Sequence, residues 1–96
     1  MSFRFREVNS FFELKKEIMR FISYNNKNDE NTFIGMNSLY PDQISFGCER
    51  TFHLKLSRCC DIINITFTDE NNPFSIETDL KHAFLFVKGL LEEARF

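Results

Sequence analysis

The sequence predicts an α+β fold: a two-layer domain in which an antiparallel sheet of about four strands is flanked in the chain by an N-terminal and a C-terminal helix. With 96 residues the chain has the length of one domain, so we expect a single core across residues 1–96. Apolar residues recur at helical spacing near both chain ends and alternate with polar residues in between. The expected order of elements is (β)-α-β-β-β-β-α, which leaves one sheet face covered by helices and the other facing solvent or a partner.

The N-terminal region predicts a short strand followed by an amphipathic helix. Apolar and charged residues alternate over Phe3 to Arg6, as they do in a half-buried strand. Ser10 and Glu13 have the spacing of a capping box, so the helix should begin there and run to about Tyr24. Its apolar stripe consists of Phe11, Leu14, Ile18, Phe21 and Ile22, and its charged face of Glu13, Lys15, Lys16, Glu17 and Arg20. The polar run from Asn25 to Asn31 should be a solvated loop.

Four strands are expected in the middle of the chain. The first, Thr32 to Ser38, should be joined to the second, Gln43 to Cys48, by a turn over Leu39 to Asp42, where a proline fixes φ. Apolar residues at every second position over Thr51 to Ser57 and over Ile63 to Thr68 indicate two half-buried strands, paired antiparallel. These strands form the sheet of the predicted fold.

The C-terminal third predicts a loop and then the longest helix. Asp69 to Asn72 should be the loop, and Pro73 suits the first helical turn because it lacks an N–H, with Ser75 as a competing N-cap. The apolar stripe of this helix consists of Ile76, Leu80, Ala83, Phe84, Val87, Leu90, Leu91 and Ala94. Leu85 lies outside that stripe, so the helix is also a candidate surface for a homodimer or for docking of a partner.

The cysteines and the short apolar runs bear on the compartment. No apolar run approaches the roughly 18 residues of a membrane span or the roughly 7 to 15 of a signal peptide, so we expect a cytoplasmic protein without a membrane segment. The number of cysteines is odd, which favours reduced thiols over a disulfide framework. Cys48 and one member of the adjacent pair Cys59 and Cys60 should pack as small apolar residues at strand ends.

Few residues could carry catalysis or bind a cofactor. His53 and His82 are expected on the surface, and no local signature pairs either of them with a cysteine as base and nucleophile. The cysteines and His53 are ligand types that zinc prefers, but the adjacent Cys59 and Cys60 project to opposite faces of a strand. The glycines are too far apart to form a phosphate-binding loop. We therefore predict a non-enzymatic protein without a cofactor or metal.

The acidic residues are unevenly distributed along the chain. The net charge is only −2, yet the segment from Cys59 to Leu80 contains five acidic residues and no basic one. A surface of one sign repels phosphate and steers an oppositely charged protein. The predicted partner-binding residues are those of this segment and the exposed leucine of the last helix: Asp61, Asp69, Glu70, Glu77, Asp79 and Leu85.

These features predict a small protein-binding domain. In size, mild acidity and general build, the chain resembles the small inhibitors that bacteria and their phages encode, such as the immunity proteins that plug the active site of a toxin. The resemblance implies an inhibitor whose partner is a basic toxin or nuclease, bound through the acidic surface.

The alternative is an RNA-binding module that uses Arg4, Arg6 and the basic strand from Arg50 to Arg58. The order helix, sheet, helix is similar to that of double-stranded RNA-binding domains. The stretch from Asp69 to Asp79, however, lacks the glycine-rich turn and the lysine cluster that those domains carry there. With the acidic segment close by, nucleic acid is the less favoured partner.

Overall fold

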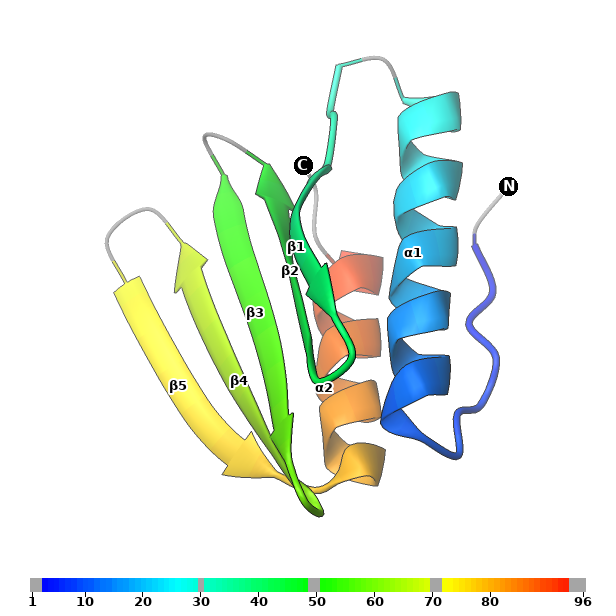
Figure 1. Cartoon of the computed structure of the whole chain (residues 1–96). Helices are drawn as coiled ribbons and strands as arrows, with labels where there is room; N and C mark the ends of the chain where they lie inside the picture. Colours follow the sequence, from blue (N-terminus) through cyan, green and yellow to red (C-terminus); the bar gives the residue numbers. More distant parts are fainter. Residues whose placement is uncertain (1–2, 30, 49–50, 70–71, 94–96) are drawn as a thin grey trace.

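The computed structural model describes residues 3–29, 31–48, 51–69 and 72–93, which form two helices and five strands. The elements are α1 (Phe11–Asn28), β1 (Gly35–Tyr40), β2 (Gln43–Cys48), β3 (Phe52–Cys59), β4 (Ile62–Asp69), β5 (Asn72–Thr78) and α2 (Leu80–Glu93). The strands form one antiparallel sheet in the order β1-β2-β3-β4-β5, with both helices against one face (Figure 1). The predicted two-layer α+β fold is confirmed, with one strand more than expected.

The additional strand, β5, takes the place of the first turns of the predicted C-terminal helix. Phe74 and Ile76 pair with Phe67 and Ile65 of β4. Apolar residues at every second position here continue the pattern of the preceding strands. Pro73 is accommodated because β5 lies at the edge of the sheet, where a missing N–H need not remove a ladder hydrogen bond. The prediction of a helix beginning near Pro73 was therefore wrong.

The C-terminal helix begins at Leu80, directly after β5. Its cap is Asp79, whose Oδ1 accepts a hydrogen bond of 2.8 Å from the backbone N–H of His82. Ala83, Val87 and Leu91 are spaced four residues apart and are at most 3% exposed, so they face the sheet. The predicted helical stripe is thus confirmed from Ala83 to Leu91, and Ala94 lies outside the described residues.

The N-terminal segment, residues 3–8, packs on the helices and forms no strand. The rings of Phe3 and Phe5 lie 5.4 and 5.6 Å from that of Phe21 on α1. Side chains of α1 bind the backbone of the segment: Arg20 Nη2 donates to Arg4 O at 2.5 Å, and Arg6 N donates to Glu17 Oε1 at 2.6 Å. These contacts replace the partner strand that the sequence pattern led us to expect.

The first helix begins as predicted and ends later. Ser10 Oγ accepts from the N–H of Glu13 at 3.1 Å, while the Glu13 carboxylate reaches back to the N–H of Asn9 at 2.6 Å. The helix continues to Asn28, through residues predicted to form a loop. The side-chain amide of Asn26 explains this extension, because it both donates to and accepts from the backbone of Ile34.

The first hairpin is tighter than predicted. The strand before it begins at Gly35, three residues later than expected, and runs on through Tyr40. Tyr40 pairs with Gln43, so only Pro41 and Asp42 form the turn. Neither turn residue has a positive φ, so this turn is not one of the mirror-image types that two-residue hairpins usually adopt.

The core lies between the helices and the covered face of β2, β3 and β4. Among the described residues, seventeen apolar side chains are buried there, and those of Phe46, Leu54, Leu56, Ile44 and Ile65 are fully inaccessible. Two charged residues of α1 are also buried, Lys15 and Glu17, each 7% exposed. Their assignment to a solvated charged face was wrong, because distant segments cover them.

Both buried charges have partners that compensate for their burial. The Nζ of Lys15 donates to the backbone oxygens of Tyr40 and Pro41 at 2.7 and 2.8 Å, which fixes α1 to the first hairpin. Glu17 accepts from Arg20 and from the Arg6 N–H, and these contacts hold its pKa below the ordinary value. The hydrogen bond from Arg20 is the largest cause of that shift.

The open face of the sheet is polar, and the strand register arranges its residues in rows. One row across the five strands consists of Ser38, Ser45, Lys55, Thr66 and Ser75. The next consists of Tyr40, Gln43, Ser57, Asn64 and Glu77. Gly47 lies on this face beside His53, and a Cβ there would come within 2.3 Å of Phe52 O. Only glycine fits at that position.

Neither α1 nor α2, as far as the structure describes them, has the length and apolar composition needed to cross a membrane.

Candidate functional site

Three of the predicted partner-binding residues meet at one end of the molecule. Both helices begin at this end, and the turns between β1 and β2 and between β3 and β4 lie there too (Figure 1). We call it the helix-start end. Asp61 and Asp79 line one surface pocket of about 390 Å³, and Asp79 and Leu85 line a neighbouring groove of about 560 Å³. The pocket and the groove also share Asn9 and Leu80, so they form one continuous surface.

The other predicted residues lie elsewhere. Asp69 ends β4, eight residues after Asp61, so the two carboxylates are separated by about 25 Å along the strand. Glu77 projects from β5 onto the open face of the sheet, where its register partner is Asn64. Glu70 lies outside the described residues. The acidic segment of the sequence is therefore not one acidic surface in the fold.

The groove beside α2 has an apolar floor and a polar rim. The N-terminal segment forms one wall and the first turns of α2 form the other. The floor consists of Val8, Leu80, Phe84 and Leu85, and the rim of Glu7, Asn9, Asp79 and Lys81. Leu85 is 52% exposed, which confirms that it lies outside the buried stripe of the helix. An apolar centre within a polar rim is the usual anatomy of a protein-binding surface.

Asp79 has a structural role as well as a position in the groove. Its Oδ1 accepts from the His82 N–H at 2.8 Å and lies 2.7 Å from the Nδ1 of the same residue. The backbone hydrogen bond, followed by the side-chain contact, lowers the pKa of this carboxyl. Asp79 is thus ionised at neutral pH and also stabilises the start of α2.

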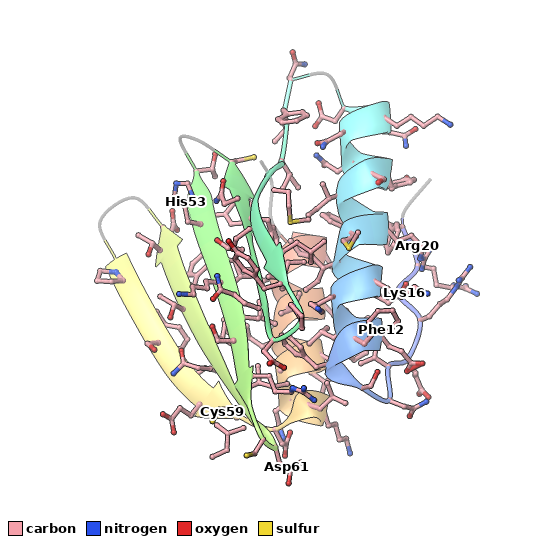
Figure 2. All side chains as sticks on the ribbon, in the orientation of Figure 1. Phe12, Lys16, Arg20, His53, Cys59 and Asp61 are labelled. Atoms are coloured by element: carbon pink, nitrogen blue, oxygen red, sulfur yellow. The ribbon has the colours of Figure 1, made fainter. Side chains whose placement is uncertain are left out.

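Asp61 lies at the tip of the hairpin between β3 and β4, as Figure 2 shows. Cys59 pairs with Ile62, so Cys60 and Asp61 form a two-residue turn. Cys60 has a φ of 55°, in the left-handed region that favours glycine, and it has the only positive φ among the described non-glycine residues. Such a turn places the carboxylate of Asp61 at the extreme end of the molecule, next to the first turn of α2.

Arg58, which also lines this pocket, is occupied by an internal contact. Its Nη2 lies 2.6 Å from Asp42 Oδ1, and its backbone N–H donates to Asp42 O at 2.8 Å. The contact ties the turn between β1 and β2 to β3. Asp42 therefore neutralises the basic group closest to Asp61 in sequence.

The residues of the RNA-binding alternative are not brought together. Arg4 and Arg6 belong to the N-terminal segment on the helix side of the molecule. Lys55 lies on the open face of the sheet, and Arg58 is paired with Asp42. Arg50 lies outside the described residues. These positions do not form one basic surface.

The cysteines and histidines differ in exposure. Cys48 is buried, and burial, followed by the negative charge of Asp29, raises the pKa of its thiol. Cys59 and Cys60 are both exposed, so the prediction that one of them packs as a small apolar residue at a strand end was wrong. His53 and Cys59 lie near opposite ends of β3 (Figure 2). Within the described ranges, no three His, Cys, Asp or Glu residues are grouped to hold a metal ion.

Sequence reasoning missed the groove because its two walls are about seventy residues apart in the chain. Val8 was the one available signal: an apolar residue two positions before the helix cap Ser10. An apolar residue directly before a helix cap often packs against the first turn of the helix that follows. Here Val8 instead packs against the core beside α2.

Comparisons of the chain with protein-family models, with curated proteins and with solved structures gave no match.

Proposed function

We propose that this protein is a non-enzymatic protein-binding domain whose partner is a basic protein. The binding surface is the helix-start end, where Asp61 and Asp79 flank the exposed Leu85 and the groove beside it. One observation carries the proposal: an apolar groove floor with a half-exposed leucine lies next to two carboxylates on one continuous surface.

The chemistry of this surface fits a partner with an apolar side chain next to lysines or arginines. Burying the exposed half of Leu85 contributes about 1 kcal/mol to binding. The carboxylates of Asp61 and Asp79 attract a basic surface and set the orientation of the encounter. Lys81 offsets part of the negative charge of Glu7 and Asp79 on the rim, so the attraction comes chiefly from Asp61 in the adjoining pocket.

Within this class we propose an inhibitor of the immunity type, which acts by covering the active site of a basic toxin or nuclease. The general build of the chain supports this role, since a small rigid domain with an acidic end can fill a basic groove. We place the protein in the cytoplasm. The exposed thiols of Cys59 and Cys60 support that assignment, because reducing compartments keep such thiols free.

The test begins with affinity capture of the partner from a cell of the source organism, followed by kinetic measurement at two ionic strengths. Leu85→Glu should accelerate dissociation about tenfold or more, because it places a charge in the apolar part of the interface. Phe33→Glu is the matched control, since Phe33 is 69% exposed and lies beside Cys48 at the other end of β2.

A second pair of variants tests the charge. Asp61→Lys should slow association and weaken its dependence on salt, whereas Asp69→Lys, at the other end of β4, should change neither as much. Equal effects of the two reversals would mean that the total charge steers the partner, and the proposed surface would be rejected. Partner binding that survives Leu85→Glu unchanged would also reject it.

A further inference from the structure

The two edges of the sheet differ in how well they are protected against another strand. Edge strands expose unpaired backbone groups, and charged residues or prolines commonly block them. β5 carries both Pro73 and Glu77. β1, with the sequence Gly-Met-Asn-Ser-Leu-Tyr, carries neither a charged residue nor a proline, although its register is irregular between Met36 and Ser38. β1 is therefore the edge that is open to strand addition.

The register identifies backbone groups on β1 that point away from the sheet. In a two-residue hairpin the residues flanking the turn form a hydrogen-bonded pair, here Tyr40 and Gln43. Leu39 and Ile44 are then a non-hydrogen-bonded pair, so the N–H and C=O of Leu39 point outward. In the described part of the chain, neither group of Leu39 is used in a hydrogen bond outside the ladder.

An apolar seam lies alongside this edge. β1 runs beside α1 and is tied to it near both ends, by Lys15 at Tyr40 and by Asn26 at Ile34. Between the ties lie Met19 of α1 and Met36 and Leu39 on the helix side of β1, which are 37%, 39% and 44% exposed. Methionine adapts to irregular partners, so such a seam can accept apolar side chains of varied shape.

The charges beside the seam are basic. The exposed positions of α1 on the side of β1 are Phe12, Lys16, Met19, Ser23 and Lys27, whereas the exposed Glu13 accepts a hydrogen bond from the N–H of Asn9 in the N-terminal segment. The Nζ of Lys16 lies 5.3 Å from the centre of the Phe12 ring, on the outer side of α1 (Figure 2). Arg20 is the next basic residue of the helix, but Glu17 neutralises it. Among the residues that the structure describes, neither Lys16 nor Lys27 forms an ion pair, so both can meet negative charge on a partner.

From these observations we infer that β1 adds a strand from an acidic, extended segment of a protein partner. The backbone of that segment pairs with the outward groups of β1, and its apolar side chains cover Met19, Met36 and Leu39. Charge complementarity selects the acidic segment over a second copy of this chain, since two copies would bring Lys16 and Lys27 of both together.

The geometry also sets the spacing of the acidic residues. Lys16 and Lys27 are eleven residues apart on α1, about 16 Å, which corresponds to about five residues of an extended strand. Side chains on one face of a strand recur at every second residue. The partner segment should therefore carry acidic residues four or six positions apart, with apolar residues at every second position between them, on the same face of the strand. This segment is distinct from the basic surface that the helix-start end is proposed to bind.

The experiment selects displayed random peptides of ten residues on the immobilised full-length protein, then measures the affinity of one selected peptide in solution. Leu39→Pro removes the outward N–H of β1 while leaving the β1–β2 ladder bonds in place. We expect it to weaken peptide binding about tenfold. Ser75→Pro is the matched control, because Ser75 occupies the equivalent outward position on β5. It should leave the affinity unchanged.

A charge variant keeps the test valid if the proline disturbs the fold, which circular dichroism would show. Lys16→Glu should weaken binding about fivefold and flatten its salt dependence, whereas Asp61→Lys at the helix-start end should not weaken it. Selected peptides that lack acidic and apolar residues together on one face of the strand would overturn the inference, as would affinities unaffected by Leu39→Pro and Lys16→Glu. A dimer in sedimentation that Leu39→Pro dissociates would overturn it in favour of a second copy.

Discussion

The covered and open faces of the sheet are built from the same strands, and they use their side chains in opposite ways. On the covered face, Ile44, Phe46, Leu54 and Leu56 are inaccessible to solvent. On the open face, the residues that alternate with them are serine, glycine, histidine and lysine. The first set provides the stability of the fold. Substitutions in the second set should change the free energy of unfolding little, so the residues at these positions can be selected for function instead of stability.

The largest expected effect comes from shortening a residue of the covered face. Phe46→Ala should lower the free energy of unfolding by about 3–5 kcal/mol, because it removes a fully buried ring and leaves a cavity. Its neighbour Ser45 points to the open face, and Ser45→Ala should change stability by less than about 0.5 kcal/mol. Urea unfolding of both variants measures the difference. Similar losses for the two would contradict the assignment of the faces.

Gly47 is an exception to the rule that residues of the open face can be substituted freely, because there is no room for a side chain at this position. Gly47→Ala should cost about 2–3 kcal/mol, since the new Cβ would overlap the backbone oxygen of Phe52. Gly89 in α2 is the control, with no atom within 4 Å of an added Cβ. Gly89→Ala should raise stability by about 0.5–1 kcal/mol through helix propensity. Thermal melting of both variants tests the opposite signs.

The same contrast between covered and open positions applies to two glutamates of α1. Glu17 is covered by the N-terminal segment, and its pKa in the folded protein lies below the ordinary value of 4.5. Its contribution to stability is therefore complete above pH 4.5 and is lost as the pH falls through its pKa in the folded protein. Glu17→Gln should cost about 1–2 kcal/mol at neutral pH and reduce the loss of stability on acidification. Glu13→Gln, at an exposed position, should have the smaller effect on this acid dependence. An unchanged acid dependence in the Glu17 variant would contradict the assignment.

The smallest effect concerns reactivity and leaves stability unchanged. Cys48 lies on the covered face, where burial raises the pKa of its thiol, whereas Cys59 and Cys60 are exposed. A thiol reagent such as Ellman's reagent should therefore modify two of the three thiols quickly in the native protein and the third only on unfolding. Mass spectrometry of the partly modified protein identifies the protected residue. Early modification of Cys48 would show that the strand ends open readily.

The sequence predicted the strands whose two faces differ most in polarity. The second strand, Gln43 to Cys48, was predicted with its observed bounds, and the next two were predicted within two residues of theirs. In all three, the apolar residues have the period of a strand. The fifth strand was missed because Pro73 and Ser75 are also typical of a helix start, and local signals could not decide between the two.

That error also concealed the candidate site. A strand over residues 72–78 returns antiparallel along β4, so Asp79 comes back beside Asp61 at the helix-start end. If the same residues formed a helix, the sheet would not bring the carboxylate of Asp79 next to that of Asp61. The burial of Lys15 and Glu17 was unpredictable for a similar reason, since it depends on segments that contact α1 only in the folded chain.

The order of the strands has a consequence for how the chain folds. Each strand pairs only with its neighbours in the sequence, so every pairing closes a short loop at small entropic cost. Sheets with crossover connections must first bring together strands that are far apart, and they form slowly for that reason. In this protein the sheet can grow one hairpin at a time. We expect the slow step to be the docking of the N-terminal segment against α2, because that contact spans most of the chain.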